Sequence, residues 1–172
     1  MKKIILLGYM GSGKSETAAA LSQKLHLDWI DLDDVIEKNA RMSVSEIFQK
    51  QGEIKFRKLE HSELSRLMHN EAGFVLSLGG GTPCYANNHE FLKADEVISF
   101  YLKTSIGDLY KRLVRQKQNR PLIANMESEE MKEFIAKNLF ERSYYYHMAS
   151  VVIDTDGKSP DDVAAEIQNH LI

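Results

Sequence analysis

The segment GYMGSGKS at residues 8–15 constrains this chain most, because it directly follows a short apolar run at Ile4–Leu7. It fits the pattern G-x-x-x-x-G-K-[ST], in which glycines let backbone N–H groups wrap phosphate oxygens at the start of a helix. In this pattern Lys14 brings a positive charge to the β- and γ-phosphates, and Ser15 brings a hydroxyl to Mg²⁺. A tight glycine turn is the simpler alternative, but the strand-loop-helix context favours a phosphate-binding loop.

The rest of the chain alternates between short apolar runs and stretches of helical periodicity. Strands are predicted at 4–7, 29–30, 74–78, 97–102 and 151–153. Helices are predicted at 17–25, within 35–68 with an interruption near Gly52, at 106–114, at 131–146 and from 160 onward. Continuously apolar strands that alternate with helices form parallel sheets covered on both faces. We therefore predict one α/β domain over residues 1–172, a doubly wound, five-stranded parallel sheet flanked by helices.

Composition excludes several classes of protein. The single cysteine, Cys84, cannot form an intrachain disulfide and suits a reducing compartment. The net charge of -3 provides no overall basic field for nucleic acid or anionic lipid. No apolar stretch approaches the ~18 residues of a membrane helix, and the first apolar run is shorter than the roughly 7 residues that a signal peptide needs. We expect a cytoplasmic protein with neither nucleic acid nor a membrane as partner.

Two further loops are predicted at the edge of the sheet that holds the phosphate loop, because ligands of such sheets bind beyond the carboxyl ends of the strands. In the first, Asp31 and Asp33 follow the second strand. A carboxylate there suits a kinase, since it orders metal-bound water and aligns or deprotonates an acceptor hydroxyl. Alternatively, Asp33 or Asp34 only caps the following helix.

The second loop is the run Gly79–Gly81 after the third strand. Three glycines forfeit backbone entropy, which indicates a close backbone approach or positive φ, although a plain tight turn is the alternative. On a predicted helix, Arg57 and Glu60 are i,i+3 neighbours. Taken alone, they are best interpreted as a solvated ion pair.

Two arginines in the C-terminal half of the chain are candidates for binding anions. Residues 115–130 form a polar stretch without apolar periodicity, which we interpret as a mobile lid carrying Arg120. Such an arginine closes over a γ-phosphate, although an isolated loop arginine is solvated by default. Arg142 continues the apolar stripe of the next helix, formed by Met131, Ile135 and Leu139. An inward arginine needs an anion, so Arg142 is a better candidate than Arg112 or Arg115.

Taken together, these motifs resemble those of the shikimate kinases, small P-loop enzymes of the nucleoside-monophosphate-kinase-like group. The resemblance spans nearly the whole chain and rests on Gly11–Ser15, Asp31–Asp33, Phe56–Arg57 with Glu60, Ser77–Gly81, Arg120–Leu122, and Arg142 ahead of Tyr144. It implies phosphorylation of the 3-hydroxyl of shikimate by ATP with Mg²⁺, a step of aromatic amino-acid biosynthesis towards chorismate. It also implies a monomer, with an acceptor-binding region at about 33–70 and a lid at about 115–130.

The resemblance implies a role for each matched residue. On the nucleotide side, ATP phosphates are held by Gly11, Ser12, Gly13 and Lys14, with Arg120 closing from the lid. Ser15 binds Mg²⁺ and Asp31 reaches it through water. On the acceptor side, Asp33 contacts hydroxyls of shikimate. The carboxylate of shikimate is held by Arg57, Arg142 and the backbone of Gly79, Gly80 and Gly81. The catalytic residues are then Lys14, Asp33 and Arg120.

Two positions depart from the family pattern. Glu16 stands where many relatives carry a second small hydroxyl residue, and we expect its side chain to point away from the nucleotide. Gly157 and Lys158 stand where relatives often present an arginine towards the adenine. A gluconate or nucleotide kinase is the alternative within the same class. A nucleotide-binding module without catalysis is the alternative from another class.

Overall fold

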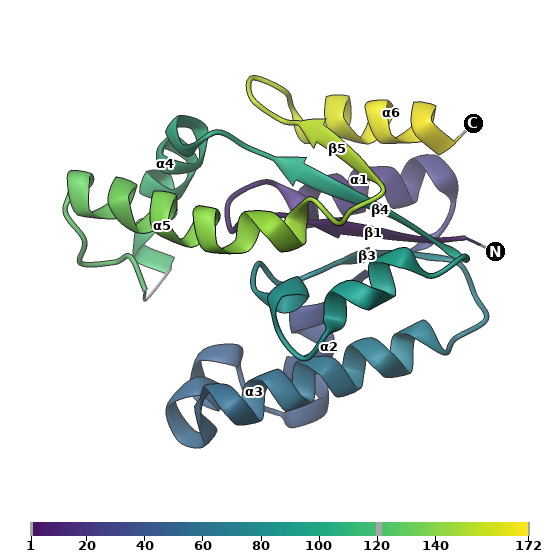
Figure 1. Ribbon diagram of the computed structural model, residues 1–172, viewed down its shortest axis with the longest axis horizontal. Helices are drawn as coiled ribbons and strands as arrows, with labels where there is room; N and C mark the ends of the chain where they lie inside the picture. The colour runs from purple at the N-terminus through teal and green to yellow at the C-terminus, as the bar shows by residue number, and fades with distance from the viewer. Residues whose placement is uncertain (1, 120–121, 172) are drawn as a thin grey trace.

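The computed structural model describes residues 2–119 and 122–171 and contains a five-stranded sheet in the order β2-β3-β1-β4-β5 (Figure 1). The strands are β1 (Lys3–Leu7), β2 (Asp28–Asp31), β3 (Phe74–Ser77), β4 (Val97–Lys103) and β5 (Val151–Asp154). Every neighbouring pair is parallel. The predicted five-stranded parallel α/β sheet is confirmed, and the carboxyl ends of all five strands lie at one edge.

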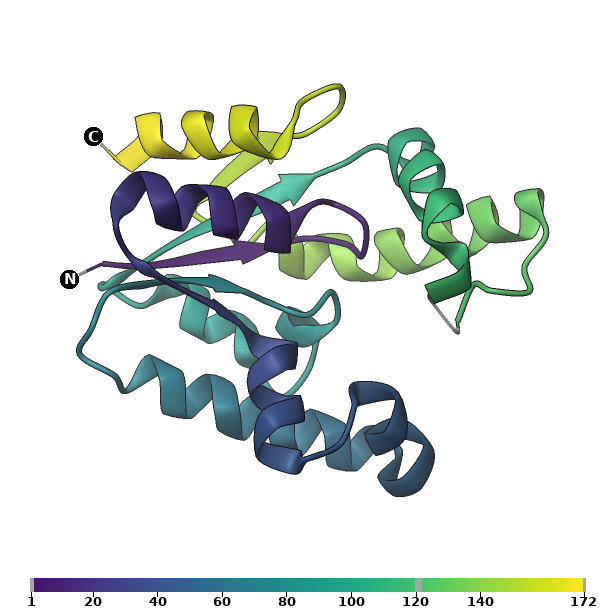
Figure 2. The same cartoon turned by 180° about the vertical axis from the view of Figure 1, so that it is seen from behind.

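Helices cover both faces of this sheet (Figures 1 and 2). They are α1 (Lys14–Leu25), α2 (Leu32–Ala40), α3 (Val44–Met68), α4 (Ile106–Arg115), α5 (Ser128–Tyr146) and α6 (Pro160–Leu171), with 3-10 turns η1 (Thr82–Cys84), η2 (Asn88–Lys93) and η3 (Lys117–Asn119). One core lies between the sheet and the pair α1 and α6, and the other lies between the sheet and α2, α3, α4 and α5.

The central strand β1 explains why the sequence shows a continuous apolar run. Ile4 and Leu6 belong to the core beneath α1 and α6, whereas Ile5 and Leu7 belong to the opposite core. Because successive side chains alternate between faces, a strand covered on both sides must be apolar throughout. Lys3 is buried at the start of this strand, and its ammonium donates to the Met68 carbonyl at 2.6 Å, at the C-terminus of α3.

Several helix boundaries differ from the prediction. The helix α2 begins at Leu32 and is capped by Asp31, whose Oδ1 accepts the Asp33 N–H at 3.0 Å, so the alternative that Asp33 or Asp34 only caps the helix was wrong. Gly52 has φ 81° inside α3 and kinks the helix, as the predicted interruption required. A second break precedes α3, where Ser43 forms a capping box with Glu46.

The polar stretch at 115–130 contains more structure than its sequence predicts. It includes η3, and α5 begins at Ser128 instead of Met131. Ile123 is fully buried in the core shared by α4 and α5, whereas its neighbour Leu122 is exposed. A short apolar run in a loop gives no periodic signal that shows which of its residues is buried, so this buried position was missed. Among residues 2–119 and 122–171, no helix has both the length and the apolar character needed to cross a membrane.

Candidate active site

A cavity of about 490 Å³ opens at the carboxyl edge of the sheet. Its floor is formed by the phosphate loop and the first turn of α1, and one end by Asp31, Asp33 and residues 77–80. The other end is formed by α4 and by the loop between β5 and α6. The three loops that the sequence analysis assigned to this edge therefore border one cavity.

The phosphate loop has the backbone conformation that its glycines permit. Gly11 and Gly13 have φ 82° and 86°, in the left-handed region that L side chains avoid. A Cβ on Gly11 would lie 2.9 Å from Leu113 Cδ2. The helix α1 begins at Lys14 without a side-chain cap, which leaves its first N–H groups for an anion. The Lys14 ammonium donates to the carbonyls of Gly8 and Tyr9, both at 2.9 Å, and so lies along the loop.

Oxygen atoms suited to a divalent cation lie beside the first turn of α1. Ser15 Oγ donates to Asp31 Oδ2 at 2.7 Å and lies 3.5 Å from Ser77 Oγ. Magnesium prefers hard oxygen ligands and keeps several waters, so two hydroxyls and a carboxylate next to a phosphate loop fit that ion. The roles of Ser15 as a direct ligand and of Asp31 as a partner through water stay predictions.

Asp33 is partly buried on the first turn of α2, close to other charged groups. Burial and the negative charges of Asp31 and Glu60 together raise the pKa of its carboxyl to about 6, although Lys14 lowers it. At neutral pH most Asp33 carboxyls are ionised and can accept a proton. Its neighbour Asp34 is exposed, which leaves Asp33 as the carboxylate of this turn that lines the cavity.

The pair Arg57 and Glu60 is not solvated. Glu60 is 1% exposed, and its Oε2 accepts from Arg57 Nη1 at 2.8 Å. The interpretation as a solvated surface pair was therefore wrong, because the i,i+3 spacing shows which residues are neighbours but not which face of the helix is covered. A buried carboxylate that holds an arginine fixes the direction of its guanidinium.

The glycine run Gly79–Gly81 is required by close approach rather than by positive φ. A Cβ on Gly81 would lie 2.6 Å from Arg57 Nη2, and one on Gly80 would lie 3.3 Å from Arg142 Nη1. A Cβ on Gly79 would lie 3.2 Å from Asp33 Oδ1. Each glycine thus makes room for one of the polar side chains that the sequence analysis assigned to the acceptor.

Arg142 points towards the glycine run from α5, as its place in the apolar stripe predicted. It is half-buried, and its Cζ lies 5.5 Å from the centre of the Tyr9 ring. One turn later, the buried Tyr146 hydroxyl donates to the Gly80 carbonyl at 2.5 Å. Residues of α5 therefore bind the glycine run from the side opposite α3.

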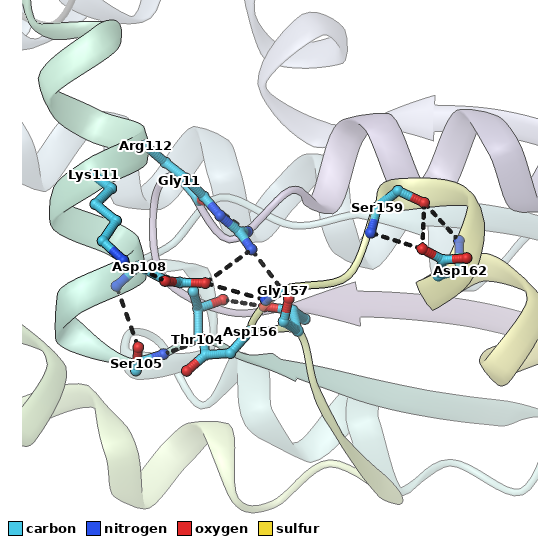
Figure 3. A network of polar contacts seen from close by, with 11 residues as sticks. Gly11, Thr104, Ser105, Asp108, Lys111, Arg112, Asp156, Gly157, Ser159 and Asp162 are labelled. Atoms are coloured by element: carbon cyan, nitrogen blue, oxygen red, sulfur yellow. Dashed lines mark hydrogen bonds and ion pairs between the residues drawn. The ribbon is translucent and has the colours of Figure 1, made fainter.

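At the end of the cavity formed by α4, Arg112 reaches from this helix towards the phosphate loop, as Figure 3 shows. Its guanidinium donates to the Thr155 carbonyl at 3.1 Å and to the Gly11 carbonyl at 3.4 Å. Asp108 lies 3.9 Å from the same guanidinium, and its Oδ2 accepts the Gly157 N–H at 3.3 Å. These contacts join α4, the phosphate loop and the loop before α6.

Comparisons with known proteins now decide the family. The model of a family described as "Shikimate kinase" matches residues 10–172. The chain belongs to the shikimate kinase family. It is 53% identical to the shikimate kinase of Flavobacterium johnsoniae over 171 residues, which are 99% of each chain. It is therefore an enzyme that transfers phosphate from ATP to shikimate with Mg²⁺, and the resemblance inferred from its motifs is confirmed.

Two solved shikimate kinases agree with the fold. The enzyme from Bacteroides thetaiotaomicron superposes with a TM-score of 0.90 at 33% identity, covering 99% of this chain and 98% of that one. The enzyme from Acinetobacter baumannii, solved in complex with shikimate, has a TM-score of 0.88 at 32% identity and covers 99% and 93% of the two chains. These findings favour a shikimate kinase over the gluconate kinase, nucleotide kinase and non-catalytic alternatives.

Three further positions that the sequence singled out in this shikimate kinase have different outcomes. Arg120 lies outside the described residues. Glu16 is exposed but borders the cavity, so the expectation that it points away is not supported. Lys158 also borders the cavity and forms a 2.6 Å ion pair with Glu166.

Arg112 was ranked below Arg142 by the sequence, yet the lining of the cavity includes Arg112 and not Arg142. The strand β4 pairs with β1, so the helix after β4 begins beside the phosphate loop. That pairing was the missing information, because strand order is not written in the apolar pattern.

The raised pKa of Asp33 predicts the pH dependence of the reaction. At saturating MgATP, kcat/KM for shikimate should fall about tenfold per pH unit below about pH 6, because the protonated carboxyl cannot accept the hydroxyl proton. Asp33→Asn should lower kcat by about 100-fold or more and remove this dependence. A coupled ADP-release assay between pH 5 and 8 measures both. An acid limb that persists unchanged in Asp33→Asn would contradict the assignment.

The same shift predicts a loss of stability. A carboxyl whose folded pKa lies above its unfolded value destabilises the fold as pH rises from about 4 to 6, and the full loss persists above pH 6. Asp33→Asn should therefore raise the free energy of unfolding by up to about 3 kcal/mol at pH 8, and by less than about 1 kcal/mol at pH 4. Urea denaturation measures it, with exposed Asp28→Asn as the control. An equal gain at both pH values would refute this origin.

Proposed function

We propose that the enzyme phosphorylates the 3-hydroxyl of shikimate at this cavity, and that Arg57 and Arg142 bind the carboxylate of the substrate. The observation that carries the proposal is the convergence of both guanidinium groups on the glycine run, because Gly79 and Gly80 of that run line the cavity together with Asp33 and the phosphate loop. Planar, bidentate guanidinium groups suit a carboxylate better than an ammonium group.

On the nucleotide side, the loop glycines Gly11 and Gly13, with Ser12, offer backbone N–H groups to the ATP phosphates, and Lys14 adds its charge. The cavity continues from this loop to Arg112, Lys158 and Pro160, which gives space for the ribose and base. Ser15 would hold Mg²⁺ directly and Asp31 through water. When bound, the ion neutralises charge on the phosphate oxygens.

On the acceptor side, the backbone N–H groups of Gly80 and Gly81 complete the carboxylate site between the two arginines. With that end of the ring fixed, a ring hydroxyl lies towards Asp33. Positioning of this kind supplies a large part of phosphoryl-transfer catalysis, because it replaces a bimolecular encounter by a fixed geometry.

The chemical step then needs few further groups. The 3-hydroxyl oxygen bonds to the γ-phosphorus while the bond to the β,γ-bridging oxygen breaks and ADP leaves. The hydroxyl proton passes to an oxygen of Asp33. Lys14 balances the charge on the transferred group, and Arg120, carried on a lid at about 115–130, adds a second positive charge there.

We further propose that residues 1–172 act as one domain with its acceptor-binding region at about 33–70. The single cysteine supports a cytoplasmic location, and the net charge of -3 supports a protein that does not bind nucleic acid. That it acts as a monomer is proposed by analogy with single-domain members of the family.

Two substitutions separate the proposed carboxylate site from the phosphate loop. Arg57→Ala should raise KM for shikimate about 10- to 100-fold, the equivalent of one charge-assisted hydrogen bond, and leave KM for ATP within about twofold. Lys14→Ala should instead lower kcat by about 100-fold or more. Steady-state kinetics with each substrate varied measures both changes.

The matched control is Arg66→Ala, which removes an exposed arginine from the same helix α3 and should leave all constants unchanged. Equal rises in both KM values for Arg57→Ala would refute the carboxylate site. A near-normal kcat for Lys14→Ala would refute its role in the transition state.

A further inference from the structure

The residue directly after the glycine run, Thr82, is fully buried and bonded to the arginine pair. Its hydroxyl donates to Glu60 Oε1 at 2.6 Å, while Glu60 Oε2 accepts from Arg57 Nη1 at 2.8 Å. We propose that Thr82 is a positioning residue for the acceptor: it fixes Glu60, and Glu60 fixes the guanidinium that binds the carboxylate of shikimate. This inference rests on the carboxylate site proposed above.

The Thr82 hydroxyl decides how the two Glu60 oxygens are shared. With one oxygen bonded to Thr82, a single oxygen is left for Arg57, so the guanidinium keeps other N–H donors for a substrate. Without that hydroxyl, the carboxylate is free to turn both oxygens towards Arg57, in the bidentate pairing that arginine favours. The arginine would then be held by the protein at the expense of the acceptor.

Other contacts restrict the Arg57 guanidinium as well. The Tyr85 ring covers one face, with its centre 4.0 Å from Arg57 Cζ. The backbone of Gly81 approaches so closely that a Cβ there would lie 2.6 Å from Nη2. Two carboxylates then direct its N–H donors: Glu53 Oε1 lies 3.5 Å from Nε, and Glu60 Oε2 accepts from Nη1 at 2.8 Å. Of the two, Glu60 is buried and forms the shorter contact, so it constrains the guanidinium more.

Thr82 also sets the distance between the glycine run and α3. Its N–H donates to the Gly79 carbonyl at 3.1 Å, and its carbonyl accepts from Asn88 Nδ2 at 2.9 Å. The buried Asn88 in turn lies 2.7 Å, through its Oδ1, from Nδ1 of His61 on α3. The loop is thus tied to two consecutive residues of α3, Glu60 and His61. A carboxylate bound jointly by Arg57 and the loop N–H groups requires this spacing.

The experiment compares Thr82→Val, which keeps the shape and removes the donor, with Thr82→Ser, which keeps the donor. Thr82→Val should raise KM for shikimate about tenfold, with KM for ATP and kcat within about twofold of the unchanged enzyme. Thr82→Ser should restore KM for shikimate to within about threefold. Ser99→Ala, which removes a buried hydroxyl from β4 away from the cavity, should leave all constants unchanged.

A double-substitution cycle tests whether Thr82 acts through Glu60. Glu60→Gln should raise KM for shikimate, and adding Thr82→Val to it should change KM by less than about twofold. Effects that multiply in the double variant would overturn the inference. So would equal losses in Thr82→Ser and Thr82→Val, or an equal rise of KM for ATP, because a general packing defect produces those results.

The outcome for Arg57→Ala separates the two levels of the proposal. If Arg57→Ala leaves KM for shikimate unchanged, the carboxylate site itself is wrong. If Arg57→Ala raises KM and Thr82→Val does not, the site stands and only the positioning role of Thr82 is overturned. Thermal melting of each variant establishes that the protein assayed is folded.

Discussion

Parallel pairing of β1 with β3 brings together the two backbone segments on which the site depends. The pairing continues past the end of β3, where the Leu78 N–H donates to the Leu6 carbonyl at 3.0 Å. A Cβ on Gly80 would consequently lie 3.4 Å from the Met10 nitrogen and 3.6 Å from the Gly8 carbonyl oxygen. The phosphate loop and the glycine run therefore touch, and two substrates bound on them are held next to each other by the sheet itself.

Charged side chains reach this junction from several helices, and their burial lowers the free energy of unfolding. The raised pKa of Asp33 reflects this destabilisation, because burial and the nearby Asp31 and Glu60 all disfavour its charged form. The fold tolerates the strain because large apolar cores lie on both faces of the sheet. A carboxylate destabilised in the free enzyme is a better proton acceptor, so the local instability and the reactivity have the same cause.

The sequence was sufficient for the features that depend on local pattern. The apolar runs predicted the five strands, and the motif at residues 8–15 predicted the phosphate loop. It was insufficient where tertiary contacts determine whether a side chain is buried and which cavity it borders. Glu60 has the spacing of a surface ion pair but is buried, and Arg112 reaches the cavity only because β4 lies beside β1. Thr82 gave no signal at all, since a threonine after glycines is ordinary in any turn.

Calorimetric titration of the enzyme with shikimate and with its uncharged carboxamide tests the central claim most directly. The two compounds have the same ring and hydroxyls and differ in the charge that Arg57 and Arg142 are proposed to bind. Two arginines that pair with a carboxylate predict a carboxamide affinity lower by about 10- to 100-fold. Equal affinities for the two compounds would contradict the account, because the acceptor would then be recognised without its charge.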